Sequence, residues 1–301
     1  MRSSRMAARW GTRTAAAVGG LALLAGLTAC GSESGDKRDA KKTNSSEEAA
    51  PAKNAIAALQ LASQSTNKQH SAKVDGNTTM AGATSEMSGG MDWSNGMRAS
   101  MTITQSGGAA EQAGASGQKR EARYTPDAMY MNLGDEFAKT PQAGGKHWVK
   151  YDYATLAEKA GPSGKFLKDQ MQNTDPARAV QVLIATGKVR EVGKEDVRGT
   201  KATHYTGVVN VSELAQMQSE DLSKQDLSDL QEQLQQSGME TETIDLWIDG
   251  DNLLVKKREQ ADSSQGKFDA TVFYSDYGTQ VSVEEPPASD TLNFEEVMQQ
   301  G

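Results

Sequence analysis

The sequence predicts an α+β fold in which helices pack against an antiparallel β-sheet that is apolar on one face. Apolar residues recur at every second position in many segments, which is the period of a strand with one buried face, and at helical spacing in a few others. Short turn sequences such as Asn95-Gly96 stand between consecutive alternating segments. This arrangement is typical of antiparallel hairpins.

The first elements are a helix and a meander of strands. Ile56, Leu59 and Ala62 recur at helical spacing after Pro51, and we expect this helix to end near residues 65–67. Alternating segments then predict strands near residues 74–80, 87–93, 97–104, 122–124, 129–133 and 148–153, with a flexible loop at 107–117 and a turn at 125–128.

The second half of the chain alternates helices with hairpins. Asp175 and Pro176 are a typical N-cap and first-turn pair for a helix that Gly187 ends. Strands are predicted at residues 189–194 and 201–211, a helical region at 212–237, strands at 244–248, 253–258, 268–274 and 281–283, and a short helix at 294–298. Residues 197–200 and 249–252 are interpreted as turns. The segment at 249–252 does not match an EF-hand calcium loop, because the glycine and the closing glutamate of such a loop stand at other positions.

Residues 1–29 have the organisation of a secretory signal peptide. Arg2, Arg5, Arg9 and Arg13 form a basic region without acidic residues, and a run of mostly apolar residues follows at 14–29. This run is shorter than the roughly 20 residues that a membrane span requires. The segment is therefore predicted to be cleaved rather than to anchor the chain.

Leu27-Thr28-Ala29-Cys30 matches the lipobox of bacterial lipoproteins, whose cysteine thiolate takes a diacylglyceryl group. Cys30 is the only cysteine in the chain, which disfavours the alternative of an ordinary signal peptide with a cysteine nearby by chance. Two acyl chains make a durable anchor. We therefore predict lipid attachment at Cys30 and a location at the extracytoplasmic face of the cell membrane.

Residues 30–51 are predicted to be the lipidated cysteine and a disordered tether, and residues 52–301 a single folded domain, because the tether has no periodicity. The chain carries 32 basic and 40 acidic residues, and removing the four signal arginines leaves 28 against 40, near −12. Such a surface repels nucleic acid. A nucleic-acid partner is therefore not expected, and the sequence identifies no protein partner.

Two segments carry a resemblance to a known family. GKEDVRGTKATHY at residues 193–205 and LWIDGDNLLV at residues 246–255, together with the order of elements, resemble the LppX/LprAFG-type lipoproteins and the wider LolA/LolB-like group over about residues 52–284. The resemblance implies a curved antiparallel half-barrel. It also implies that helices cross the concave face and enclose an apolar cavity that holds lipid acyl chains.

Methionines in the meander are the candidate lining of such a cavity. Methionine is flexible and polarizable, so it suits surfaces that accept varied apolar ligands. An ordinary sheet core packed against helices is the alternative interpretation. The residues concerned are Met80, Met87, Met91, Met97, Met101, Met129 and Met131.

No enzyme activity, metal or cofactor is expected. His70, His147 and His204 lie far apart in the sequence, and no cysteine pair could complete a zinc site. Two Ser-x-x-Lys segments, at 65–68 and 264–267, lack the Lys-Thr-Gly partner of penicillin-binding proteins. The expected function is non-catalytic binding or carriage of a lipid or other amphiphile. The alternative is an envelope sensor or protein-interaction module on the same fold.

Overall fold

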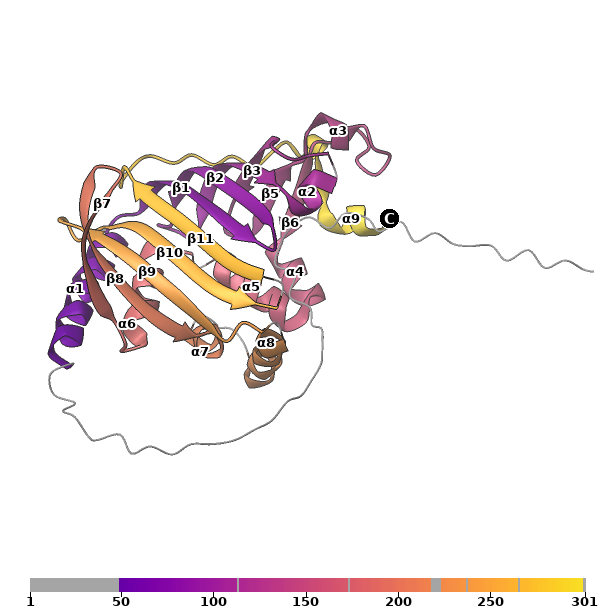
Figure 1. The fold of residues 1–301 in the computed structure, drawn as a ribbon. Coiled ribbons are helices and arrows are strands. Elements are labelled where there is room, and N and C mark those ends of the chain that lie inside the picture. The colour runs from indigo at the N-terminus through magenta and orange to yellow at the C-terminus, as the bar shows by residue number, and fades with distance from the viewer. Residues whose placement is uncertain are drawn as a thin grey trace, which may run out of the picture.

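Figure 1 shows the fold in a computed structural model, which describes residues 49–112, 114–172, 174–217, 223–236, 238–264 and 266–299. Within these ranges, twelve strands form one sheet in the order β12-β6-β5-β4-β3-β2-β1-β11-β10-β9-β8-β7. Neighbouring strands pair antiparallel, except that β12 pairs with β6 in parallel. The two end strands are not paired with each other, so the sheet is open.

The strands cover residues from both halves of the chain. They are β1 (Ser71–Met80), β2 (Ala83–Asp92), β3 (Arg98–Ser106), β4 (Lys119–Tyr124), β5 (Ala128–Asn132), β6 (Trp148–Asp152), β7 (Arg190–Val197), β8 (Thr200–Asn210), β9 (Thr241–Asp249), β10 (Leu254–Ser263), β11 (Gly266–Ser275) and β12 (Thr291–Asn293).

The helices precede, interrupt and follow the strands. They are α1 (Ala49–Asn67), α2 (Gly108–Gln112), α3 (Gly134–Ala138), α4 (Tyr153–Lys159), α5 (Gly161–Gln172), α6 (Pro176–Ala185), α7 (Val211–Met217), α8 (Lys224–Gln236) and α9 (Phe294–Gln299), with a 3₁₀ turn at Ala288–Asp290.

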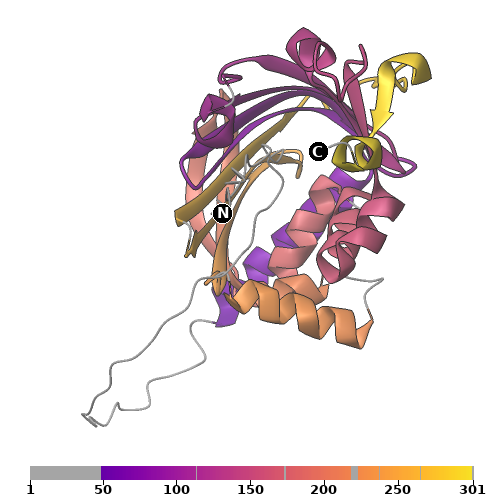
Figure 2. The same ribbon diagram turned by 90° about the vertical axis from the view of Figure 1, so that its right-hand side faces the viewer.

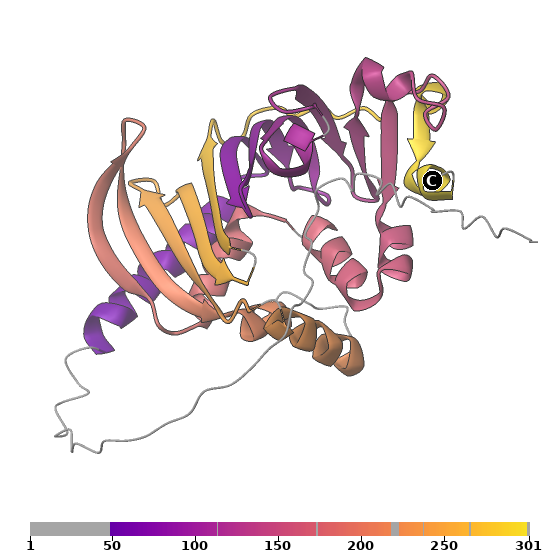
Figure 3. The same cartoon turned by 45° about the vertical axis from the view of Figure 1, so that its right-hand side comes forward.

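The sheet curves, and Figure 2 shows α1, α4, α5, α6 and α8 on its concave side. Figure 3 shows the two halves of the sheet, with α1 behind the β7–β11 half and the α4–α5 pair beneath the β1–β6 half. The predicted fold class, a curved antiparallel half-barrel with helices on the concave face, is confirmed.

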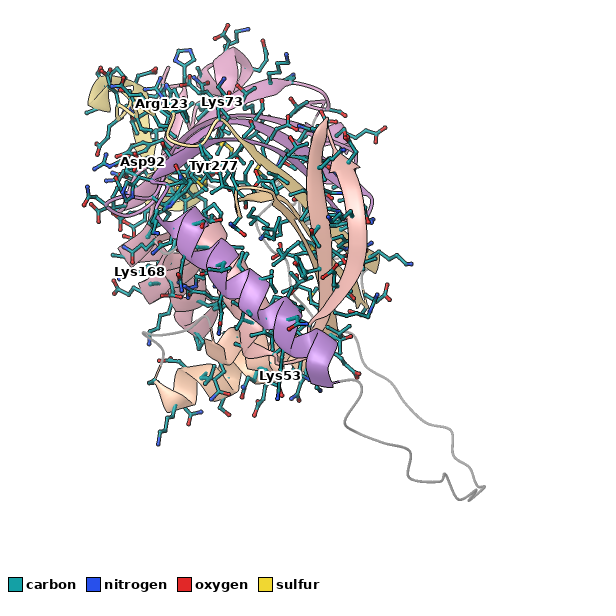
Figure 4. All side chains as sticks on the ribbon, turned by 90° about the vertical axis from the view of Figure 1, so that its left-hand side faces the viewer. Lys53, Lys73, Asp92, Arg123, Lys168 and Tyr277 are labelled. Carbon is teal, nitrogen blue, oxygen red and sulfur yellow. The ribbon has the colours of Figure 1, made fainter. Side chains whose placement is uncertain are left out.

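The main core lies between α1, α6 and the concave face of the sheet. Ala55, Leu59 and Ala62 form the fully buried stripe of α1, at the spacing of one helix face. They pack with Val180 and Leu183 of α6 in one buried cluster that also contains sheet residues. Figure 4 shows α1 crossing this side of the molecule from Lys53 towards Tyr277.

Two local features bring the helices close to the sheet. A Cβ on Gly207 of β8 would lie 2.6 Å from Cδ1 of Leu183, so glycine at this position lets α6 approach the strand. The register of β10 shifts between Leu254 and Lys256, and the Leu254 backbone N–H donates to Oγ1 of Thr66 at 3.2 Å. This bond fixes the end of α1 to the bulge.

Most predicted elements are present, including the α1 end at Asn67, the α6 cap and the turns. The Asp175 side chain accepts a hydrogen bond from the Arg178 backbone N–H at 2.9 Å, as expected for the N-cap. Gly96 and Arg198 adopt positive φ angles in their turns, at 77° and 52°. Asp249 accepts from two backbone N–H groups within its turn, which confirms the hairpin interpretation.

Several predictions need correction. Residues 281–283 are not a strand: Val281 packs against Gly90 of β2, so its alternation with Val283 reflects an extended segment lying on the sheet rather than pairing with it. The helical region at 212–237 contains two helices, α7 and α8, and the loop at 107–117 begins with the short helix α2. Helices α4 and α5 were not predicted.

Candidate ligand-binding face

The strand register places residues of successive strands in rows across the concave face. One row joins Leu246, Lys257, Val272, Gly76, Met87 and Ile103 from β9 through β10, β11, β1 and β2 to β3. Another row on this face, separated from the first by the row of Ile244 and Glu259, joins Glu242, Ala261, Phe268 and Met80 on β9, β10, β11 and β1. These rows belong to the same face as the main core, because Ile244 and Leu246 of β9 lie in it.

Apolar side chains in the middle of this face are only half-buried. Ile244 and Leu246 on β9 are 2% and 0% exposed beneath the helices. In contrast, a set of apolar side chains on the other strands of this face remains partly exposed to solvent. Buried helix residues of the main core come from α1 and α6. The half-buried group comprises Met80, Met87, Ile103, Phe268 and Val272.

The structure divides the seven predicted methionines among several environments. Met91, Met97 and Met101 are buried in the main core with α1 and α6. Met131 is buried in a second cluster with Val149 and Tyr151, against which Met129 packs. Met80 and Met87 are half-buried on the open middle of the face. The seven therefore do not form one continuous wall, and their lining role stays a prediction.

Three charged side chains lie on the same concave face. Nζ of Lys257 donates to Oε1 of Glu259 at 2.7 Å, with the two side chains 19% and 23% exposed. Glu242 is 8% exposed and lies diagonally across from Glu259, since Ile244 is the direct partner of Glu259. We refer to Glu242, Lys257 and Glu259 as the charged cluster.

The electrostatics of this cluster follow from burial. Burial raises the pKa of Glu242 to about 8, with a further contribution from the Glu259 carboxylate, against the opposing effect of Lys257. Burial lowers the pKa of Lys257. Glu259 and other nearby groups together raise it by more, so the net shift of the pKa is upward. Lys257 is therefore positively charged at neutral pH, whereas burial favours the protonated form of Glu242.

The sequence contained a signal for this cluster. Residues 256–259 are Lys-Lys-Arg-Glu, four consecutive charges within a strand. Because successive side chains of a strand point to opposite faces, two of the four must lie on the buried face. Lys256 and Arg258 lie on the convex side, where Lys256 stacks on Trp247 at 3.8 Å from the ring centroid.

A pocket of about 550 Å³ opens at one end of the main core, between the β2–β3 turn and the α5–α6 pair. Of the seven methionines predicted to line a cavity, Met97 lines this pocket. The lining is mixed, so this pocket differs from the wholly apolar cavity that a carrier of acyl chains would require. The lining residues are Trp93, Gly96, Met97, Gln172, Thr174, Asp175, Arg178, Gln181, Val182 and Ala185.

The histidines lie in separate polar environments. His147 Nδ1 is 2.7 Å from Oδ1 of Asp290, and His204 lies between Glu195 and Asp245, at 2.8 Å from an oxygen of each. His204 also stacks on Trp247 on the convex face. Across the described ranges, no group of three or more histidine, cysteine, aspartate or glutamate side chains could hold a metal ion.

Cys30 and the signal segment lie outside the described residues. Among the helices that the structure does describe, none is long and apolar enough to cross a membrane.

The chain is similar to solved structures of mycobacterial lipoproteins and to two proteins of Streptomyces. No family model matches it. Among solved structures it is similar to LprF from Mycobacterium bovis, 17% identical over 78% of this chain and 98% of that one with a TM-score of 0.46. It is also similar to the Mycobacterium tuberculosis lipoprotein LppX, 15% identical over 77% and 99% with a TM-score of 0.47. Both belong to the group that the sequence resembles.

Two Streptomyces proteins are similar along most of their length. The chain is 45% identical over 251 residues to an "Uncharacterized 31.2 kDa protein in rplA-rplJ intergenic region" of Streptomyces griseus, covering 82% of this chain and 81% of that one. It is 34% identical over 302 residues to "Putative lipoprotein SCO4650" of Streptomyces coelicolor, covering 95% and 96%. The chain belongs to the family of these two Streptomyces proteins.

Proposed function

We propose that this protein is anchored to the extracytoplasmic face of the cell membrane through lipid on Cys30 and binds an amphiphile, non-catalytically, along its concave face. The observation that carries the proposal is the half-buried apolar group Met80, Met87, Ile103, Phe268 and Val272. Burying an acyl chain against such a surface yields about 0.8 kcal/mol for each CH₂ group, before the cost of association.

Ile103 and Val272 pack against the edge of the main core, and Met80, Met87 and Phe268 continue the same face of the sheet. They come from three neighbouring strands, β1, β2 and β11, and from β3 beside them, so they form one surface. Methionines contribute two of the five, which lets the surface adapt to chains of different shape. The tether is expected to keep this surface within reach of the bilayer.

The experiment measures lipid that accompanies the full chain. The protein is extracted from membranes into a nonionic amphipol, and organic solvent then removes non-covalent lipid, which mass spectrometry quantifies per protein. Acyl groups attached to Cys30 stay on the polypeptide and do not contribute. We expect the wild-type protein to retain an amphiphile in a stoichiometric amount.

Two neighbouring residues of β3 provide a matched pair of variants. Ile103 is half-buried on the concave face, and Thr102 is exposed on the other side. Ile103→Arg places a charge on the proposed surface and should reduce retained lipid several-fold, whereas Thr102→Arg should not. Equal retention in both variants, or none in the wild type, would refute binding on this face and favour the sensor or interaction-module alternative.

A further inference from the structure

A polar groove of about 440 Å³ lies on the convex face of the sheet. Strand alternation places its lining on the face opposite to the half-buried apolar group. Residues of β1 form one side of the groove, residues of β10 form the other, and β11 runs between them. We refer to it as the convex groove. Its lining residues are Asn77, Thr79, Lys256, Arg258, Lys267, Asp269 and Thr271.

The strand register brings four different polar groups together at one end of the convex groove. Asn77, Thr271 and Arg258 are direct neighbours in one row across β1, β11 and β10. Lys256 precedes Arg258 on the same face, about 7 Å away along β10. An amide, a hydroxyl, a guanidinium and an ammonium group therefore line a space roughly 10 Å across, because neighbouring strands are about 4.8 Å apart.

The carboxylates closest to this end are held by arginines. Asp269 accepts a hydrogen bond from Nε of Arg258 at 3.0 Å. Asp75, one row away from Asn77 on β1, forms an ion pair with Arg198. The acidic side chains of this area are therefore engaged, although the chain as a whole has an excess of acidic residues.

Lys256 is in a different position, because no carboxylate within the described ranges lies at ion-pair distance from it. Its ammonium group lies over Trp247 instead, at 3.8 Å from the ring centroid. Glu195 and Asp245 attract it from further away, and each of them contacts a ring nitrogen of His204 at 2.8 Å. Burial lowers the pKa of Lys256, and neighbouring guanidinium groups lower it further. An anion in the convex groove would offset both effects.

We propose that the convex groove binds a phosphate ester, whose oxygens contact the Lys256 ammonium, the Thr271 hydroxyl and the Asn77 amide. A phosphate group offers three acceptor oxygens, which matches three separate donors, and its hydrogen bonds to a charged donor are strong. Arg258 stays on Asp269 and holds that carboxylate away from the phosphate. This inference is independent of the proposed function, because the convex groove and the apolar group lie on opposite faces.

The test titrates the full-length protein in nonionic amphipol with glycerol 3-phosphate at constant ionic strength, by isothermal titration calorimetry. Lys256→Gln removes the ammonium group. Thr271→Val removes a hydroxyl at nearly the same shape and leaves the net charge unchanged. The matched control is Lys201→Gln, which removes the charge of an exposed lysine elsewhere in the sheet.

We expect saturable binding of one glycerol 3-phosphate per wild-type chain. The Kd should rise about tenfold in Lys256→Gln, because a hydrogen bond between charged groups is lost, and several-fold in Thr271→Val. Lys201→Gln should keep the wild-type Kd. Circular dichroism confirms that each variant is folded.

A soluble phosphate ester and a phospholipid headgroup share this chemistry, and a second titration separates them. Dihexanoyl phosphatidic acid carries the same glycerol phosphate on two short acyl chains. Equal affinity for the two probes assigns the convex groove to soluble esters, whereas tighter, Lys256-dependent binding of the lipid assigns it to headgroups. The proposal is overturned if neither probe shows binding that depends on Lys256, or if Lys256→Gln and Lys201→Gln weaken binding equally.

Discussion

Glu242 makes the free energy of unfolding depend on pH, and the substitution Glu242→Gln should remove this dependence. Burial raises the pKa of its carboxyl group from the ordinary value of 4.5 to about 8. Between these values the folded chain holds a proton that the unfolded chain releases, so stability falls as the pH rises. For a single group, the free energy of unfolding falls by about 2 kcal/mol between roughly pH 6 and pH 8.

Urea denaturation of the full chain, followed by tryptophan fluorescence at several pH values across this window, measures the effect. Glutamine has nearly the same shape as glutamate and cannot ionise, so the difference between the wild-type and Glu242→Gln curves isolates this one carboxyl group. Glu240→Gln should follow the wild type, because its side chain is exposed. Parallel wild-type and Glu242→Gln curves would refute the conclusion that burial holds this group neutral.

Three further predictions concern other parts of the chain. Tyr153 buries a hydroxyl that has no hydrogen-bond partner within the described ranges, so Tyr153→Phe should not lower the denaturation midpoint. Tyr277→Phe removes a 2.5 Å hydrogen bond to a backbone carbonyl and should lower the free energy of unfolding by about 1 kcal/mol. Equal losses of stability in the two variants would contradict this. The hydrogen bond between His147 and Asp290 raises the pKa of His147 and lowers the pKa of Asp290. The contact should therefore weaken as pH rises through the His147 pKa, and again as pH falls through that of Asp290. NMR titration of the amides at 288–297 checks this, and a flat profile would count against it. Cys30→Ala should abolish acyl labelling and release the protein from the membrane fraction; a variant that is still labelled would disprove the anchor.

The sequence predicted elements whose signals are local. The alternation of Ile244, Leu246 and Ile248, the Asn95-Gly96 turn and the Asp175 cap each depend on residues close in the chain, and each is present. Strand pairing then follows from short turns. This is why the meander and the hairpins were predictable without knowledge of tertiary contacts.

Elements that depend on distant contacts were not predictable. Helix α5 contains two glycines and a proline and has little helical pattern of its own. A Cβ on Gly164 would lie 2.1 Å from the Leu156 carbonyl oxygen, and Arg178 forms an ion pair with the buried Asp169 at 3.1 Å. Close packing on α4 and α6 therefore stabilises a helix whose local sequence is weak.

The candidate site shows the same division. The apolar face was predicted from alternation, but the separation of the methionines between the core and the open surface depends on where α1 and α6 lie. The charged cluster also needed the register, since only the pairing of β9 with β10 brings Glu242 close to Glu259.

The short strand β12 has a consequence for how copies of this protein meet. It occupies the outer edge of β6 with only three residues, and the opposite edge strand β7 carries five charged side chains within Arg190–Val197. Unprotected strand edges recruit strands from other molecules. A protein confined to a membrane surface, as proposed here, meets its copies far more often than one free in solution. The three-residue strand β12 at one edge and the charged side chains of β7 at the other therefore disfavour edge-to-edge strand pairing between copies that lie close together.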